Sequence, residues 1–175
     1  NEHHYQRLQG LLSEARSKGR ILIGGQCSHS EKRIAPTVIE IENDGANDQL
    51  MEEELFGPLL PLITISNLEE ALVHVRKQEK PLALYMFGGT KKDQEKLIDK
   101  TSSGGICFND VIMQAGIPEL PFGGTGASGL GRYHGHSGFE NFSNKKSILK
   151  RPFWLDLKLR YPPYKVDLSF LKKIL

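Results

Sequence analysis

The chain has 175 residues, of which 38% are hydrophobic and 25% are charged, and its formal net charge is +2 at pH 7. This balance is typical of a soluble globular domain with its own hydrophobic core, and it gives no reason to expect nucleic acid as a partner. No stretch approaches the roughly 18 consecutive apolar residues that a membrane span needs.

The first part of the chain is predicted to form a helix followed by two strands. Apolar residues recur at helical spacing between Tyr5 and Ala15, and Gly19 suits the C-cap that ends this helix. Residues 21–23 are a short apolar run, and residues 36–42 alternate apolar and polar side chains as a half-buried strand does. An α/β arrangement is therefore expected.

The middle of the chain alternates predicted strands and helices with short joins. Three apolar segments are the predicted strands: residues 59–65, 82–87 and 105–109. Ser66 and Glu69 stand at capping-box spacing before one helix, and Thr90 can cap the next. This order predicts parallel crossovers in a three-layer, mostly parallel α/β sheet, whose ligands bind at the carboxyl ends of the strands. Asn109 falls at such an end.

A carboxylate and an aromatic ring stand two residues apart at Glu54 and Phe56, just before Gly57-Pro58. Residues two apart share one face of an extended segment, so both side chains can address one ligand. A carboxylate suits a ribose diol, and an aromatic ring suits a flat heterocycle. Taken alone, the acidic run 52–54 is explained as well by a solvated turn, and adjacent carboxylates point in different directions.

Residues 124–129 match the letters GxGxxG of the dinucleotide-binding fingerprint. That motif follows a strand and opens a helix, whereas Pro118 and Pro121 interrupt the approach and no apolar helical stripe follows. A glycine-rich loop that wraps a pocket explains the run better, because glycine permits positive φ. An unrelated α/β module that binds a phosphate with this loop is the alternative, and it requires a helix that opens at Gly129.

Histidine and cysteine residues complete the candidates for chemistry. His134 and His136 stand two residues apart without the further ligands of a metal site. A general base is one interpretation, and a polar loop residue at the mouth of a cavity is the simpler one. Cys107 lies in a predicted buried strand and Cys27 in a turn, with no CxxC pair. Neither thiol adjoins a basic cluster in sequence, so neither is a candidate nucleophile, and free thiols favour a reducing, intracellular compartment.

An ordered set of motifs resembles the aldehyde dehydrogenase superfamily. The main ones are Glu54-Leu55-Phe56-Gly57-Pro58, Lys80-Pro81-Leu82-Ala83-Leu84-Tyr85 and Leu120-Pro121-Phe122-Gly123-Gly124. The run 129–135 and the tail sequence 160–164 are similar to the class 3 and fatty aldehyde dehydrogenase branch. The resemblance covers residues 1–148 and begins after the place of the family's catalytic cysteine. The chain therefore resembles the C-terminal portion of such an enzyme.

The resemblance implies roles for five residues. Glu54 is expected to hold the nicotinamide-side ribose of NAD or NADP, and Phe56 to pack against the nicotinamide ring. Phe122 is expected to line the aldehyde tunnel, His134 to lie towards its mouth, and Asn109 to sit beside the site. In the family, a cysteine thiolate attacks the aldehyde, a hydride passes to NAD(P), and water hydrolyses the thioester. The nucleophile and base are expected upstream, so the chain alone is expected to be inactive.

The resemblance also implies an organisation: residues 1–142 as a partial catalytic domain, 143–151 as an oligomerisation strand, and 152–175 as a C-terminal tail. That strand implies a homodimer or pairing with a full-length partner subunit. The tail could begin a membrane-associating helix, so a cytoplasmic location or a peripheral one on an intracellular membrane is expected. The implied substrates are long-chain or aromatic aldehydes. The alternative is a non-catalytic, truncated family member that serves as an oligomerisation partner.

Overall fold

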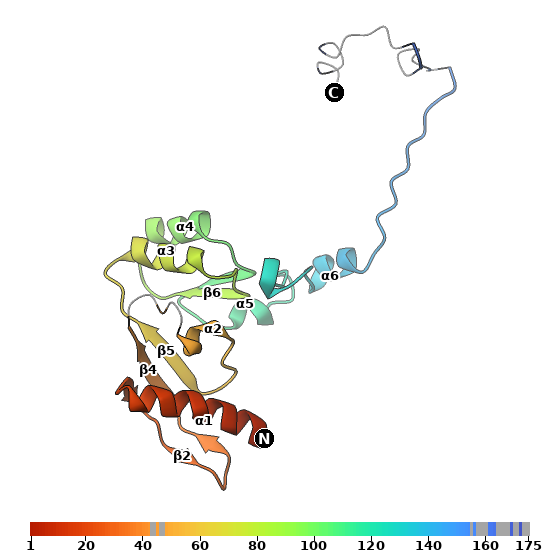
Figure 1. Ribbon diagram of the computed structural model, residues 1–175. Coiled ribbons are helices and arrows are strands. Elements are labelled where there is room, and N and C mark those ends of the chain that lie inside the picture. Colours follow the sequence, from red (N-terminus) through yellow and green to blue (C-terminus); the bar gives the residue numbers. More distant parts are fainter. Residues whose placement is uncertain are drawn as a thin grey trace.

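A computed structural model describes residues 1–42, 45, 48–154, 156, 161–163, 169 and 172. Its elements in chain order are α1 (Glu2–Ser17), β1 (Ile21–Ile23), β2 (Cys27–Ser28), β3 (Arg33–Ile34), β4 (Thr37–Ile41), α2 (Gln49–Glu52), β5 (Leu59–Ile63), α3 (Leu68–Lys77), β6 (Ala83–Met86), α4 (Lys91–Lys100), β7 (Gly105–Phe108), α5 (Met113–Gly116), the 3₁₀ helix η1 (Gly126–Ser128) and α6 (Gly135–Asn141). Figure 1 shows their arrangement. The predicted α/β class is confirmed.

The main core lies between α1 and the sheet β1–β4–β5. β4 is the middle strand, antiparallel to β1 and parallel to β5, with Thr37 opposite Leu59. Helix α1 crosses this sheet (Figure 1) and turns its predicted apolar stripe inward, so that Leu12 is fully buried against a sheet whose Ile39 is equally buried. The helix ends at Ser17 with Lys18 as its C-cap, and Gly19 follows with a φ of +68° that glycine adopts without strain.

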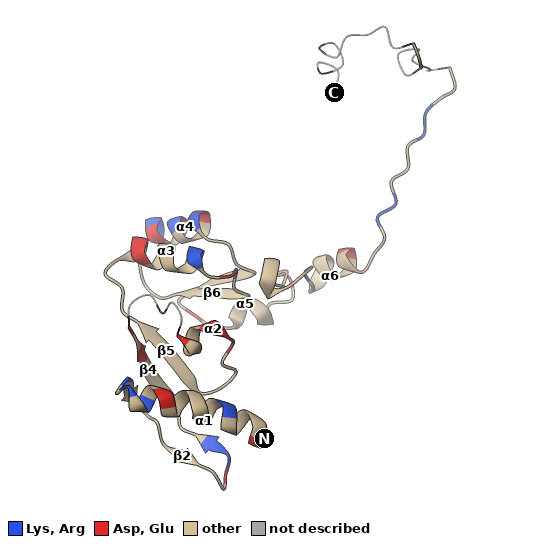
Figure 2. Ribbon diagram, viewed as in Figure 1, with Lys and Arg blue, Asp and Glu red and all other residues tan. Residues whose placement is uncertain are grey.

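The second sheet consists of β6 and β7, which pair in parallel with Ala83 opposite Gly105 and are joined through α4. The expectation of one continuous sheet is wrong in detail: among the described strands, β5 pairs with β4 and β6 pairs with β7. Periodicity identifies a strand but not its neighbour, which long-range packing selects. Helices α3 and α4 lie side by side (Figure 1), and both contain acidic and basic residues (Figure 2). Lys96 of α4 forms an ion pair with Glu69 of α3.

Helix α3 begins one residue later than the capping pattern predicts. The side chain of Asn67 accepts a hydrogen bond from the Glu70 amide (3.1 Å), and the Glu70 carboxylate accepts one from the Ser66 amide (2.7 Å). The predicted pair was Ser66 with Glu69. Asparagine caps a helix as well as serine does, so the register moves by one residue. Helix α4 begins as predicted after Thr90, which forms a capping box with Asp93.

The corrected cap is open to a direct test. We expect Asn67→Ala to lower the free energy of unfolding by about 1 kcal/mol, because the Glu70 amide loses its acceptor. Ser66→Ala is the matched control, with a change below about 0.5 kcal/mol, because Ser66 contributes its backbone N–H rather than its hydroxyl. Urea denaturation measures both. A larger loss of unfolding free energy in Ser66→Ala than in Asn67→Ala would instead indicate that Ser66 is the N-cap.

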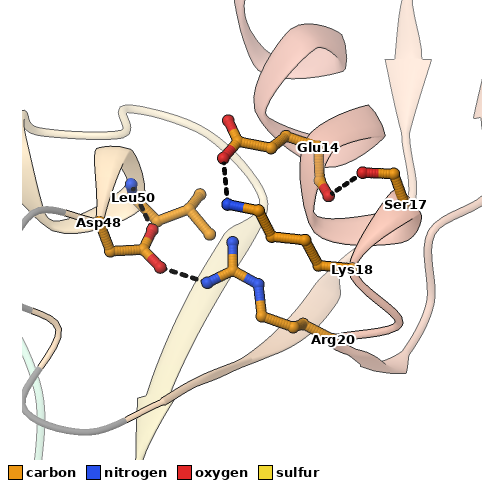
Figure 3. A network of polar contacts seen from close by, with 6 residues as sticks. All are labelled: Glu14, Ser17, Lys18, Arg20, Asp48 and Leu50. Carbon is orange, nitrogen blue, oxygen red and sulfur yellow. Dashed lines mark hydrogen bonds and ion pairs between the residues drawn. The ribbon is translucent and has the colours of Figure 1, made fainter.

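A buried ion pair links the start of β1 to the start of α2 (Figure 3). Arg20, which is 8% exposed, pairs with Asp48, and Asp48 also accepts a hydrogen bond from the Leu50 amide (3.0 Å) as the N-cap of α2. Burial acts to raise the pKa of Asp48, but the hydrogen bonds from Arg20 and Leu50 and the charge of Arg20 outweigh it, and the pKa lies below its ordinary value. Sequence reasoning did not find this pair.

The segment predicted as an oligomerisation strand is not a strand in the single chain. Residues 143–151 form neither helix nor strand, and Ile148 and Leu149 are 72% and 92% exposed. Its proposed contact with another subunit stays a prediction. The predicted start of a membrane-associating helix involves Leu168, Phe170, Leu171, Lys173, Ile174 and Leu175, which lie outside the described residues. Within the described residues, no helix is long and apolar enough to cross a membrane.

Candidate functional site

The first part of the candidate site is the carboxyl edge of β6 and β7. Asn109 lies at this edge, as predicted, although β7 ends one residue earlier than the predicted strand, and Asn109 has a φ of +58°. Its amide donates to the Met86 carbonyl (2.8 Å), and its side-chain oxygen accepts from the Gly88 amide (2.7 Å). Asn109 therefore ties the ends of the two strands together, a structural duty that the sequence did not indicate.

Substitutions at Asn109 separate the contribution of its side-chain hydrogen bond from that of its left-handed backbone conformation. Asn109→Ala is expected to lower the free energy of unfolding by about 2 kcal/mol, because it removes the acceptor for Gly88 and places alanine in the left-handed region. Asn109→Gly is expected to cost only about 1 kcal/mol, since glycine adopts positive φ freely. Urea denaturation compares them. A glycine variant less stable than the alanine variant would contradict this division.

An aromatic cluster forms the second part of the site and brings two predicted residues together. Phe122 and Tyr133 exchange backbone hydrogen bonds of 2.9 Å, and their rings meet edge to face at 5.7 Å between centroids. His134 stacks on Phe122 at 5.9 Å and lies 4.4 Å from the Tyr133 ring. His134 has a φ of +81°, and its buried Nδ1 has no hydrogen-bond partner among the described residues. Tyr133 is the member that sequence reasoning missed.

Phe122 also lines a small, largely apolar cavity of about 190 Å³. The other lining residues are Leu82, Gly104, Gly105, Ile106, Gln114, Leu120 and Pro121. The amide nitrogen of Gln114 donates to the Tyr85 hydroxyl (3.1 Å), which holds Gln114 at this wall. Such a lining suits an apolar group with few polar contacts.

Arg132 holds the glycine-rich loop against the start of β7. Its guanidinium donates to the carbonyls of Gly104 (2.6 Å) and Gly123 (3.0 Å). A Cβ on Gly123 would lie 2.3 Å from the Gly131 carbonyl, so close backbone packing requires glycine there. The next helix after the GxGxxG run is α6, which begins at Gly135 rather than at Gly129. The helix at Gly129 that the phosphate-binding alternative requires is therefore not found among the described residues. None of the residues that line the cavity beside Phe122 belongs to the run 124–129, so the pocket-wrapping interpretation stays a prediction. An arginine inside a glycine run was the available signal for Arg132.

The loop with Glu54 and Phe56 forms the third part. Both residues are exposed, Phe56 to 79%, and Phe56 has a φ of +47°. The premise of an extended segment is therefore wrong at Phe56, because the chain turns there into Gly57-Pro58. Helix α1 anchors the loop: a Cβ on Gly57 would lie 2.4 Å from a methyl of Leu8.

The loop and the aromatic cluster remain separate within the described residues. No hydrogen bond, ion pair or ring contact among them joins Glu54 or Phe56 to Phe122, His134 or Asn109. Sequence reasoning placed all five residues around one site, whereas the contacts of the described residues bring together only Phe122 and His134. The cofactor roles of Glu54 and Phe56 and the substrate roles of the other three stay predictions.

The comparisons with known proteins agree with the fold and with the order of the motifs. The aldehyde dehydrogenase family model matches residues 1–148. The chain is 46% identical to aldehyde dehydrogenase family 3 member B1 of Rattus norvegicus over 166 residues, which is 94% of this chain and 34% of that protein. The chain therefore belongs to the aldehyde dehydrogenase family.

Solved structures give the same result. The substrate-bound Staphylococcus aureus AldH matches with a TM-score of 0.78 and 37% identity, over 99% of this chain and 37% of that one. A Mycobacterium tuberculosis aldehyde dehydrogenase complexed with NAD⁺ matches with a TM-score of 0.74 and 27% identity, over 86% of this chain and 31% of that one. The chain spans about a third of the length of these relatives.

Proposed function

We propose that this chain is the C-terminal part of an NAD(P)-dependent aldehyde dehydrogenase that oxidises long-chain or aromatic aldehydes to acids. The observation that carries the proposal is the apolar cavity beside stacked Phe122 and His134, in a chain that belongs to this family. An apolar wall with few polar groups favours an aldehyde with an apolar tail or ring over a small polar one.

The residues of the loop fit the cofactor that the family implies. Glu54 forms no hydrogen bond or ion pair within the described part of the chain, so its carboxylate is free to accept from ribose hydroxyls. The exposed ring of Phe56 offers a flat apolar face to a heterocycle. NAD or NADP supplies the hydride acceptor of the reaction. We propose that Glu54 and Phe56 hold and orient that cofactor.

We propose that the nucleophile comes from a segment outside this chain. Cys107 is half-buried within β7, and the Cys27 thiol lies 3.7 Å from the Gly25 carbonyl, to which it can donate. Neither belongs to the aromatic cluster that Phe122 and His134 form. The chain alone is therefore expected to lack dehydrogenase activity.

Aldehyde-dependent NADH or NADPH formation tests the proposal. The chain is assayed alone and mixed with an upstream polypeptide, meaning one that supplies the catalytic cysteine and the dinucleotide-binding domain of the family. The proposal is supported if the chain alone shows no dehydrogenase activity and the mixture is active. A preference for long-chain or aromatic aldehydes over acetaldehyde supports the substrate class. Activity of the chain alone contradicts it and points to Cys27 or Cys107.

The second candidate is a non-catalytic partner that associates through residues 143–151. The exposed Ile148 and Leu149, in a segment without strand pairing in the single chain, favour this candidate, because an unpaired apolar segment can pair with another chain. Association with the upstream polypeptide or a full-length subunit without any aldehyde oxidation would select it.

A substitution at Phe122 tests the apolar wall. Phe122→Ala is expected to raise KM for a long-chain or aromatic aldehyde by about 10-fold, since part of an apolar contact surface is lost. Phe122→Leu retains most of that surface and should change KM far less. Steady-state kinetics of the mixed proteins measure both. An unchanged KM in Phe122→Ala would remove Phe122 from the substrate site.

A further inference from the structure

One arginine of α1 holds the loop that carries Glu54 and Phe56. The guanidinium of Arg7 donates through one nitrogen to the Leu55 carbonyl (2.5 Å) and through another to the Glu53 carboxylate (2.7 Å). Leu55 is the residue between Glu54 and Phe56. A single side chain therefore fixes the main chain at the centre of the loop and a side chain at its start.

This loop requires an external support. Residues 53–58 belong to no helix or strand, and Phe56 combines a φ of +47° with a side chain that is 79% exposed. A bulky residue in the left-handed region is costly and persists only where its surroundings hold it. The exposed ring cannot supply that support by burial. Leu55 packs against the main core and Gly57 against Leu8. The Pro58 carbonyl accepts from the Thr37 amide (2.8 Å) at the end of the loop, and Arg7 supplies the side-chain hydrogen bonds to its start and centre.

We infer that Arg7 is a positioning residue for the cofactor, one that acts through the Leu55 carbonyl to hold Glu54 and Phe56 in a receptive conformation. This inference rests on the proposed function. The partly buried bond to Leu55 carries the effect, because a charged donor on a sheltered carbonyl is strong, whereas the ion pair with Glu53 is exposed and screened. A guanidinium fork reaches both partners at once, which an ammonium group does not.

The test compares Arg7→Met with Arg16→Met. Arg16 lies on the same helix and also donates to a backbone carbonyl, that of Gly25, outside the loop. Arg7→Met in the mixed proteins is expected to raise KM for NAD(P) by about 10-fold, with kcat and the aldehyde KM changed less than about twofold. Hydrogen exchange over residues 53–58, read by mass spectrometry without cofactor, is expected to become faster. Arg16→Met should show neither effect.

Two further variants separate the bonds of Arg7. Glu53→Gln removes the ion pair and leaves the bond to Leu55, so its cofactor KM should stay near that of the unmodified protein. Arg7→Lys retains the charge but not the fork, so its cofactor KM should lie between those of Arg7→Met and the unmodified protein. If Arg7→Met does not fold, Arg7→Lys decides by the same comparison of KM values.

Several results would overturn the inference. One is an unchanged cofactor KM in the Arg7 variants of an active protein. Another is an equal rise in the cofactor KM and the aldehyde KM, or the same pattern in Arg16→Met, because either indicates a merely structural role. If the unmodified mixture oxidises no aldehyde, the proposed function fails and exchange decides about Arg7. Faster exchange over residues 53–58 in Arg7→Met but not in Arg16→Met then supports the positioning role, and unchanged exchange rejects it.

Discussion

Asp48→Asn is expected to lower the free energy of unfolding by about 3–5 kcal/mol, because it leaves the buried charge of Arg20 without a partner. Arginine stays protonated in proteins, so Arg20 cannot relieve the cost by losing its proton. Asparagine keeps a side-chain oxygen that can still accept from the Leu50 amide and cap α2. The substitution therefore isolates the charge from the cap. Urea denaturation gives the difference.

The neighbouring exposed pair supplies the control. Lys18 and Glu14 form an ion pair of 2.6 Å on the surface of α1, beside Arg20 and Asp48 (Figure 3). Glu14→Gln is expected to change stability by less than about 0.5 kcal/mol, since solvent screens exposed charges. The double variant Arg20→Met with Asp48→Asn should recover much of the loss, because no buried charge remains. Equal losses from Asp48→Asn and Glu14→Gln would show that burial of Arg20 contributes nothing.

The same pair predicts a pH dependence. The pKa of Asp48 is lower in the folded protein than its ordinary value, so the folded state favours the ionised form. The stabilisation is fully present above that ordinary value and is lost as the pH falls through the lower, folded-state pKa. Below about pH 4, the stability of the unmodified protein should therefore fall more steeply than that of Asp48→Asn. Parallel curves would contradict the assignment.

Glu54→Gln is expected to raise KM for NAD(P) by about 10- to 100-fold, because a hydrogen bond to a charged acceptor becomes one to a neutral amide. The aldehyde KM should change little, since Glu54 has no contact with the aromatic cluster within the described residues. The matched control is Glu52→Gln, an exposed carboxylate of the same acidic run at the end of α2. Steady-state kinetics of the mixed proteins measure both. An equal rise in KM for NAD(P) in Glu52→Gln would indicate that the negative charge of the whole acidic run, rather than Glu54 itself, determines cofactor binding.

Much of the secondary structure followed from local patterns. The stripe from Tyr5 to Ala15 and the cap at Thr90 describe α1 and α4 as the structure has them, because helix periodicity and capping act over a few residues. The predicted N-cap of α3 was wrong by one residue, because asparagine and serine cap helices almost equally well and Asn67 takes this position in place of Ser66. The order of predicted strands, however, does not indicate which strands pair with each other.

The sequence by itself determined the family, the α/β class and the residues Glu54, Phe56, Asn109, Phe122 and His134 as candidates, since motifs and periodicity are properties of neighbouring residues. Only the tertiary structure decided the separate sheets, the pairing of Arg20 with Asp48 across 28 positions, and the bond from Arg7 to Leu55 across 48. It also placed Phe56, Asn109 and His134 at positive φ. Such features depend on burial and on partners distant in sequence, because a strained backbone or a buried charge persists only where the completed fold supports it.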